Sequence, residues 1–130
     1  MERKLEKLPD AELDVMLALW RYRSPVRTSQ ILGDVRDARN WSLSTLKVLL
    51  GRLADKGFVE VTRQGRFTLY RALVSEADYR RQETQGLLKR YYKNSVKSMI
   101  AALVEEESLS GEELSELEEL IRKAGENHGA

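Results

Sequence analysis

Cysteine is absent from the 130-residue sequence, proline occurs twice and histidine once. Without cysteine the chain can form neither a disulfide nor a thiolate metal site. The one histidine, His128, has no evident serine or carboxylate partner with which to form a catalytic pair. We therefore expect no enzymatic activity, no bound metal and no cofactor.

Long hydrophobic runs are also missing. No apolar stretch approaches the roughly 20 residues that cross a bilayer as a helix. The segment Met1–Lys4 carries charges of both signs instead of the apolar core of a signal peptide. These two absences predict a cytoplasmic protein.

The charges that are present are distributed unevenly. The formal net charge is only +1. However, residues 1–75 hold 14 Lys and Arg against 9 Asp and Glu, and residues 76–130 hold 8 against 12. A basic first part followed by an acidic second part indicates two functions in one chain, the first directed at a polyanion.

Hydrophobic periodicity predicts a mainly α fold with a small β-hairpin. Two short β-branched and aromatic runs flank Gln64-Gly65, which is the pattern of a hairpin. The expected order is three helices, two strands and three further helices, over residues 9–21, 28–35, 42–56, 58–62, 66–72, 76–93, 96–104 and 110–124. The apolar residues expected to form the buried side of the first helix are Leu13, Met16, Leu17 and Trp20.

The third and sixth predicted helices have the clearest ends. Ser42 can cap the first turn of the third helix, and Gly57 supplies a residue on which that helix can end. Ser110 and Glu113 have the spacing of a capping box at the start of the sixth. The expected buried side of the third helix consists of Leu46, Leu49, Leu50 and Leu53.

Three helices followed by a hairpin is the order of a winged helix-turn-helix domain, with the hairpin as the wing. The side of the third helix opposite Leu46 carries small residues with basic ones at its margins. That combination suits contact with base edges and phosphates of double-stranded DNA. The predicted DNA-binding residues are Ser44, Thr45, Lys47, Val48, Arg52, Arg63 and Arg66.

The second part of the chain is predicted to dimerise. We expect a winged helix-turn-helix DNA-binding domain over 1–74, a three-helix dimerisation domain over 75–124 and a disordered tail over 125–130. About 50 residues bury too little surface alone, so these helices, with Tyr79 and Tyr92 among their aromatic residues, are expected to pack against a symmetry mate. The predicted interface comprises Leu87, Tyr91, Val96, Met99, Ile100, Leu103, Leu114 and Leu117.

Two other functions fit the same layout. A winged helix can be a protein-interaction module that never contacts DNA, and its binding would then be insensitive to salt. A regulator of the MarR or PadR kind would respond to a small molecule bound in a cavity between the domains. The sequence patterns alone leave both alternatives open.

Several motifs together resemble the penicillinase-repressor family, which includes the BlaI and MecI repressors and the related copper-responsive CopY repressors. The resemblance covers about residues 5–123 and is closer to BlaI and MecI than to CopY. The motifs lie at Asp10–Met16, Leu19-Trp20, Trp41–Thr45, Arg52–Gly57, Tyr70–Ser75 and Glu105–Ser110.

This resemblance implies a homodimeric transcriptional repressor at a palindromic operator, with antibiotic-resistance or stress-response genes under its control. In BlaI and MecI proteins a membrane β-lactam sensor triggers cleavage within the dimer domain, and the cleaved Asn-Phe pair aligns with Ala102-Leu103 here. The chain lacks the cysteine tail of CopY repressors. Leu43-Ser44 also replaces the Pro-Lys that typically follows Trp-Ser in BlaI and MecI, so a different operator sequence is expected.

Overall fold

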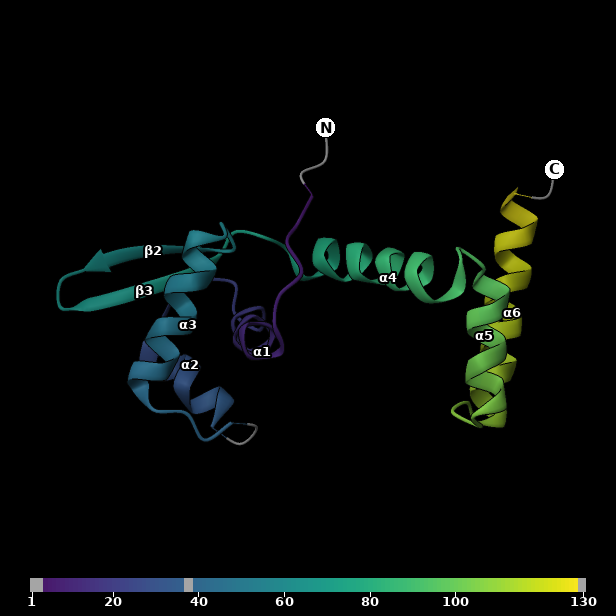
Figure 1. The fold of residues 1–130 in the computed structure, drawn as a ribbon, viewed down its shortest axis with the longest axis horizontal. Helices are drawn as coiled ribbons and strands as arrows, with labels where there is room; N and C mark the ends of the chain where they lie inside the picture. The colour runs from purple at the N-terminus through teal and green to yellow at the C-terminus, as the bar shows by residue number, and fades with distance from the viewer. Residues whose placement is uncertain (1–3, 37–38, 129–130) are drawn as a thin grey trace. The chain divides into compact units, whose positions relative to one another are not determined.

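A computed structural model describes residues 4–36 and 39–128 of the chain. It forms two compact units, residues 1–84 (the N-terminal unit) and residues 85–130 (the C-terminal unit). The elements, labelled in Figure 1, are α1 (Asp10–Leu19), β1 (Val26–Arg27), α2 (Thr28–Val35), α3 (Leu43–Asp55), β2 (Val59–Gln64), β3 (Phe67–Ala72), α4 (Glu76–Tyr92), α5 (Val96–Glu105) and α6 (Gly111–His128). The predicted mainly α fold with a hairpin is confirmed.

Helix α3 has the predicted ends and the predicted buried side. The Ser42 hydroxyl accepts a hydrogen bond from the Thr45 N–H at 3.2 Å, which caps the first turn. Beyond the last turn, Gly57 adopts φ +81°, a conformation that a Cβ would strain. All four predicted leucines of α3 are buried, together with Phe58.

The sheet contains one strand that the sequence did not predict. Its order is β1-β3-β2, antiparallel throughout, because the two-residue strand β1 adds to the edge of the hairpin. Gln64 pairs with Phe67, so the turn is Gly65-Arg66 and not the predicted Gln64-Gly65. Gly65 has φ +62°, which suits the first central position of a type II′ turn.

The core of the N-terminal unit lies between α1, α2, α3 and the sheet. In α1 the buried side is centred on Val15, Met16 and Leu19, whereas Leu17 is 44% exposed. The prediction that Leu17 is buried is therefore wrong. Its spacing fits a helical stripe, but three-dimensional packing selects the neighbouring side of the helix.

The beginning of α4 belongs to the N-terminal unit. Tyr79 is buried, and its ring contacts Phe58 edge-on with 5.8 Å between the ring centroids. Its hydroxyl accepts a hydrogen bond from the Leu8 N–H at 2.8 Å. The amide of Gln82 bonds to both backbone polar groups of Leu5. The expectation that Tyr79 packs across a dimer is thus wrong, because its contacts are with the winged-helix core.

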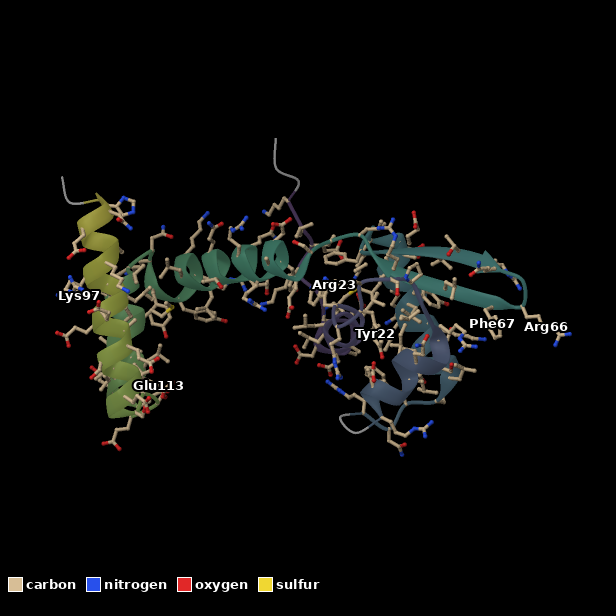
Figure 2. All side chains as sticks on the ribbon, turned by 180° about the vertical axis from the view of Figure 1, so that it is seen from behind. Tyr22, Arg23, Arg66, Phe67, Lys97 and Glu113 are labelled. Atoms are coloured by element: carbon tan, nitrogen blue, oxygen red, sulfur yellow. The ribbon has the colours of Figure 1, made fainter. Side chains whose placement is uncertain are left out.

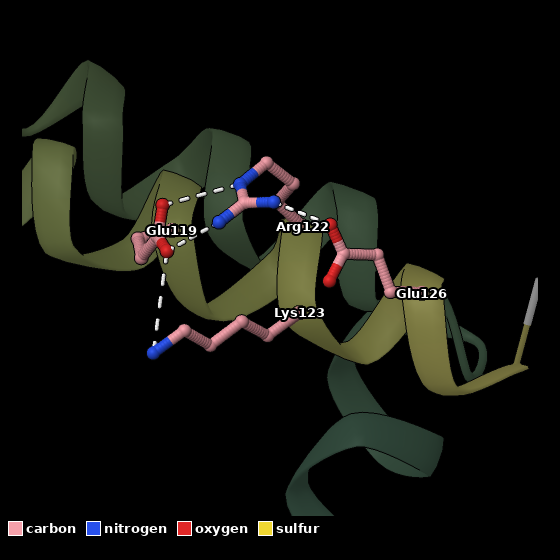
Figure 3. A network of polar contacts seen from close by, with 4 residues as sticks. All are labelled: Glu119, Arg122, Lys123 and Glu126. Atoms are coloured by element: carbon pink, nitrogen blue, oxygen red, sulfur yellow. Dashed lines mark hydrogen bonds and ion pairs between the residues drawn. The ribbon is translucent and has the colours of Figure 1, made fainter.

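The C-terminal unit consists of the end of α4 followed by α5 and α6. The predicted capping box of α6 is confirmed: the Ser110 hydroxyl accepts from the Glu113 N–H at 3.1 Å, and the Glu113 carboxylate accepts from the Ser110 N–H at 3.0 Å. Helix α6 continues to His128, although the sequence predicted a disordered tail from Gly125. Arg122 pairs with Glu119 and with Glu126, and these side chains connect the last turns of α6 (Figure 3).

Helices long and apolar enough to cross a membrane are not found among the described residues.

Candidate nucleic-acid interface

The seven residues predicted to bind DNA are all exposed. Five lie on α3, on the side away from its buried leucines, and two lie on the hairpin, Arg63 in β2 and Arg66 in the turn. The side chain of Arg66 points away from the end of the hairpin (Figure 2). None of the described elements of the N-terminal unit covers these side chains. The positions on α3 are Ser44, Thr45, Lys47, Val48 and Arg52.

The centre of the exposed side of α3 is built of small side chains. Val48 is 54% exposed, and a Cβ placed on Gly51 would meet no atom within 4 Å. At the first turn the Ser42 hydroxyl lies 3.0 Å from that of Ser44 and 3.1 Å from that of Thr45. A helix with so little bulk on one side can approach the floor of a groove closely.

The basic side chains around this surface are not neutralised by the chain. Within residues 4–36 and 39–128, the side chains of Lys47, Arg52, Arg63 and Arg66 form no ion pair and no hydrogen bond. Arg71, on the same hairpin, is different because it pairs with Glu60 across the strands at 3.0 Å. These four cations therefore lie on α3 and towards the hairpin tip, where a polyanion can take the place of carboxylates.

Ion pairs made by Lys56 and by Arg39 hold the helix-turn-helix in position. Lys56, after the last turn of α3, donates to the buried carboxylate of Glu12 on α1 at 2.5 Å and lies 3.2 Å from Glu6. The bond to Glu12 is the main cause that raises the pKa of Lys56 above its ordinary value of 10.5. Arg39 bonds to Asp14 at 2.8 Å, between α1 and the segment that leads into α3.

The guanidinium of Arg39 also lies over the ring of Trp41, 5.5 Å from its centroid. Sequence reasoning missed Glu12, Arg39 and Lys56 as residues that position the site. No local pattern reveals such pairs, because Lys56 and Glu12 are 44 residues apart and their meeting depends on how α1 packs against α3.

Comparison with known proteins decides the family. The model of the penicillinase repressor family matches residues 8–123. The chain belongs to the penicillinase repressor family. The penicillinase repressor of Bacillus licheniformis is 31% identical over 121 residues, which are 93% of this chain and 94% of that protein. The methicillin resistance regulatory protein MecI of Mammaliicoccus sciuri is 30% identical over 125 residues, 95% of this chain and 99% of that protein.

Two solved structures of the repressor BlaI match somewhat more than half of the chain. The solution structure of the DNA-binding domain of the repressor BlaI has a TM-score of 0.51 and 31% identity, covering 60% of this chain and 94% of that domain. Monomeric Bacillus licheniformis BlaI in complex with the blaP half-operator has a TM-score of 0.50 and 32% identity, covering 58% of this chain and 92% of that one. The winged-helix fold predicted for this part is confirmed by both.

The C-terminal unit of this family member has an apolar surface that its own described residues do not cover. None of its described side chains is buried, although α5 and α6 each have an apolar side. Leu87, Tyr91, Val96, Leu103 and Leu114 are exposed. The remaining predicted interface residues are partly buried, namely Met99, Ile100 and Leu117.

Proposed function

We propose that the chain is a homodimeric transcriptional repressor that binds a palindromic operator in double-stranded DNA. In this proposal α3 enters the major groove and the β2–β3 hairpin lies along the neighbouring minor groove. One observation carries it above all: Lys47, Arg52, Arg63 and Arg66 are exposed and unpaired within the described residues and surround a surface of small side chains. Half-operator binding by BlaI, whose structure aligns with the N-terminal unit, supports the same conclusion.

The small number of side chains that can contact bases makes dimerisation necessary for specific binding. Each winged helix offers few side chains to the bases, essentially Ser44, Thr45, Lys47 and Val48. A single copy would therefore bind weakly, and specificity requires two copies on an inverted repeat. The uncovered apolar residues of α5 and α6 are the surface that we assign to the symmetry mate.

Release from DNA by a membrane sensor protease belongs to the same proposal, with Ala102-Leu103 as the site. These two residues lie in the last turns of α5. Their carbonyl groups accept hydrogen bonds from the Glu106 and Ser108 N–H groups, each at 3.1 Å. Because a protease requires an extended peptide, α5 must unfold locally before cleavage. Alanine and leucine also differ from the Asn-Phe pair that such sensors cut in BlaI and MecI, so we expect slow cleavage here.

Operator selection from random duplexes tests the function directly. The full-length protein should enrich an inverted repeat, with an affinity that falls steeply as salt rises. Arg52→Ala should weaken binding to the selected and to a random duplex alike, by about fivefold per protomer at 0.15 M salt. Arg122→Ala is the matched control, because it removes the same charge from α6, where Glu119 and Glu126 already neutralise it.

The residues that read bases need a different test. Lys47→Ala and Val48→Leu should each change the enriched sequence, whereas Arg52→Ala should leave it unchanged. If all variants return the same sequence, α3 is not the reading element. If wild-type protein shows no salt-dependent binding to any duplex, the function is that of a protein-interaction module. If a small molecule releases the intact dimer, regulation is of the MarR or PadR kind.

A further inference from the structure

An exposed aromatic ring on the hairpin is stacked against the guanidinium group of an arginine from another strand. The guanidinium carbon of Arg27, in β1, lies 4.6 Å from the centroid of the Phe67 ring, in β3. Phe67 is 51% exposed and contributes nothing to the core. Figure 2 shows Phe67 beside Arg66 near the end of the hairpin. A cation held over the face of a ring in this way has a fixed position on an otherwise open surface.

The strand register explains why these two side chains meet. Arg27 pairs with Leu69, so Phe67, two residues nearer the turn, is its diagonal neighbour on the same side of the sheet. Arg63 pairs with Thr68 and therefore projects from the opposite side. Among the described residues of the sheet, one arginine without a carboxylate partner lies on each side, Arg27 and Arg63, and Arg66 lies in the turn. Arg71, on the same side as Arg27, is paired with Glu60.

Stacking does not consume the hydrogen-bonding capacity of Arg27. Its N–H donors point outward in the plane of the guanidinium, whereas the ring covers only one face of that plane. No carboxylate pairs with the Arg27 side chain within residues 4–36 and 39–128. Arg39 provides the contrast: it also lies over an aromatic ring, that of Trp41, but its Nε–H donates to Asp14 and its charge is paired.

The charges of the hairpin indicate a ligand that presents negative charge to both sides of the hairpin. Between Val59 and Ala72 the only acidic residue is Glu60, which is already paired with Arg71. Arginines therefore remain free on both sides of the hairpin, without an acidic neighbour that would repel a phosphate. The minor groove of B-form DNA is bordered by two phosphate strands, one on each side.

We propose that Arg27, positioned by the ring of Phe67, is a further phosphate-binding residue, and that Arg27 and Arg63 contact the two strands on either side of the minor groove. The inference rests on the proposed DNA-binding function. Arg27 is also the N-cap residue immediately before α2, and its own N–H donates to the Gln30 side chain at 2.9 Å. The contact would therefore anchor the first helix of the helix-turn-helix to the backbone of DNA.

Salt-dependent binding of the full-length protein to its selected operator and to a random duplex tests the assignment. Arg27→Gln should weaken both by about fivefold per protomer at 0.15 M salt and reduce the salt slope by about one unit per protomer. Arg27→Lys should keep the slope, because the charge remains. Arg71→Gln is the control: it removes the same charge from the sheet, but from a residue paired with Glu60, and should leave the slope unchanged.

Phe67 is tested as a positioning residue. Phe67→Leu should weaken binding by about twofold to threefold and retain the slope, because Arg27 keeps its charge but loses its position. Phe67→Tyr should bind like the wild type, because an aromatic ring remains at this position. In an Arg27→Gln background, Phe67→Leu should add nothing, since it acts through Arg27.

Two results would overturn the inference while leaving the function intact. One is a wild-type salt slope for Arg27→Gln, and the other is full additivity of the two substitutions. Circular dichroism melts of every variant establish that the sheet remains folded. If the wild-type protein itself binds duplexes without salt dependence, the proposed function fails, and that result is distinguishable from either of the two.

Discussion

The two compact units differ most in what they bury. All 17 buried hydrophobic side chains of the described chain lie in the N-terminal unit, from Leu8 to Tyr79, whereas the C-terminal unit buries none. The N-terminal unit therefore has a core of its own. The helices of the C-terminal unit have caps and apolar sides, but none of their described side chains beyond residue 84 is fully buried. Local signals can specify helices without specifying a self-sufficient fold.

Charged substitutions on α5 should have the largest effect of those that distinguish the C-terminal from the N-terminal unit. Ile100→Glu combined with Leu103→Glu should convert the dimer to a monomer, because two carboxylates cannot be buried in an apolar interface. Operator affinity should then fall by about 10² to 10⁴, since each copy binds its half-site independently. Sedimentation and operator titration measure both effects.

Leu17→Glu is the matched control for that experiment. Leu17 is 44% exposed and Leu103 is 40% exposed, yet Leu17 belongs to the N-terminal unit. Its substitution should leave the dimer intact. A dimer that survives the α5 substitutions would show that the symmetry mate contacts another surface, and the comparison between the units would lose its basis.

Leucine truncation in each unit gives the next largest effect. Leu50→Ala creates a cavity in the N-terminal core and should cost about 3–5 kcal/mol of unfolding free energy at any protein concentration. Leu114→Ala should destabilise only the associated form, so its cost should shrink as the protein is diluted below the dimer dissociation constant. Urea unfolding at several protein concentrations distinguishes the two. A cost independent of concentration for Leu114→Ala would mean that the C-terminal unit has its own core.

The sequence predicted most of the elements that local signals define. Helix α3, with its Ser42 cap, its four leucines and Gly57, required only residues within one helix and its ends. The capping box at Ser110 is equally local. The exposed positions of the candidate site followed from the same periodicity, because the side opposite the leucines must face outward.

Long-range contacts could not be predicted in this way. Helical spacing predicts that Tyr79 packs, but it does not show against which partner. The hydrogen bond that decides its partner joins it to Leu8, 71 residues away. The two residues of β1 are too short to show an alternating period. For the same reason the stack of Arg27 on Phe67 follows only from the register of the sheet.

The two units also differ in which residues adopt a positive φ, and substitutions there should change the free energy of unfolding by about 1 kcal/mol. In the N-terminal unit only glycines have positive φ among the described residues, whereas in the C-terminal unit Lys93, Asn94 and Glu107 do. Gly57→Ala should therefore destabilise the protein by about 1–2 kcal/mol, and Glu107→Gly should stabilise the turn between α5 and α6 by about 1 kcal/mol. Thermal and urea unfolding measure both. Equal effects of the same sign would show that backbone strain does not distinguish the units.

Alkaline titration provides the finest test of the N-terminal unit, because three of its groups have raised pKa values. The bond to Glu12 raises the pKa of Lys56, the bond to Asp34 raises that of Tyr22, and burial raises that of Tyr79. Each group binds its proton more tightly when folded. Their contribution is therefore complete below the ordinary values of 10.0 for tyrosine and 10.5 for lysine and is lost as pH rises through the folded pKa.

Tryptophan fluorescence can follow this loss selectively, since both tryptophans, Trp20 and Trp41, lie in the N-terminal unit. Above pH 10.5 the urea midpoint from fluorescence should fall, and Glu12→Gln should reduce its pH dependence. Far-ultraviolet circular dichroism, in contrast, reports the helices of both units together. A fluorescence midpoint that stays constant to pH 11 would mean that the three groups titrate alike in the folded and unfolded chains.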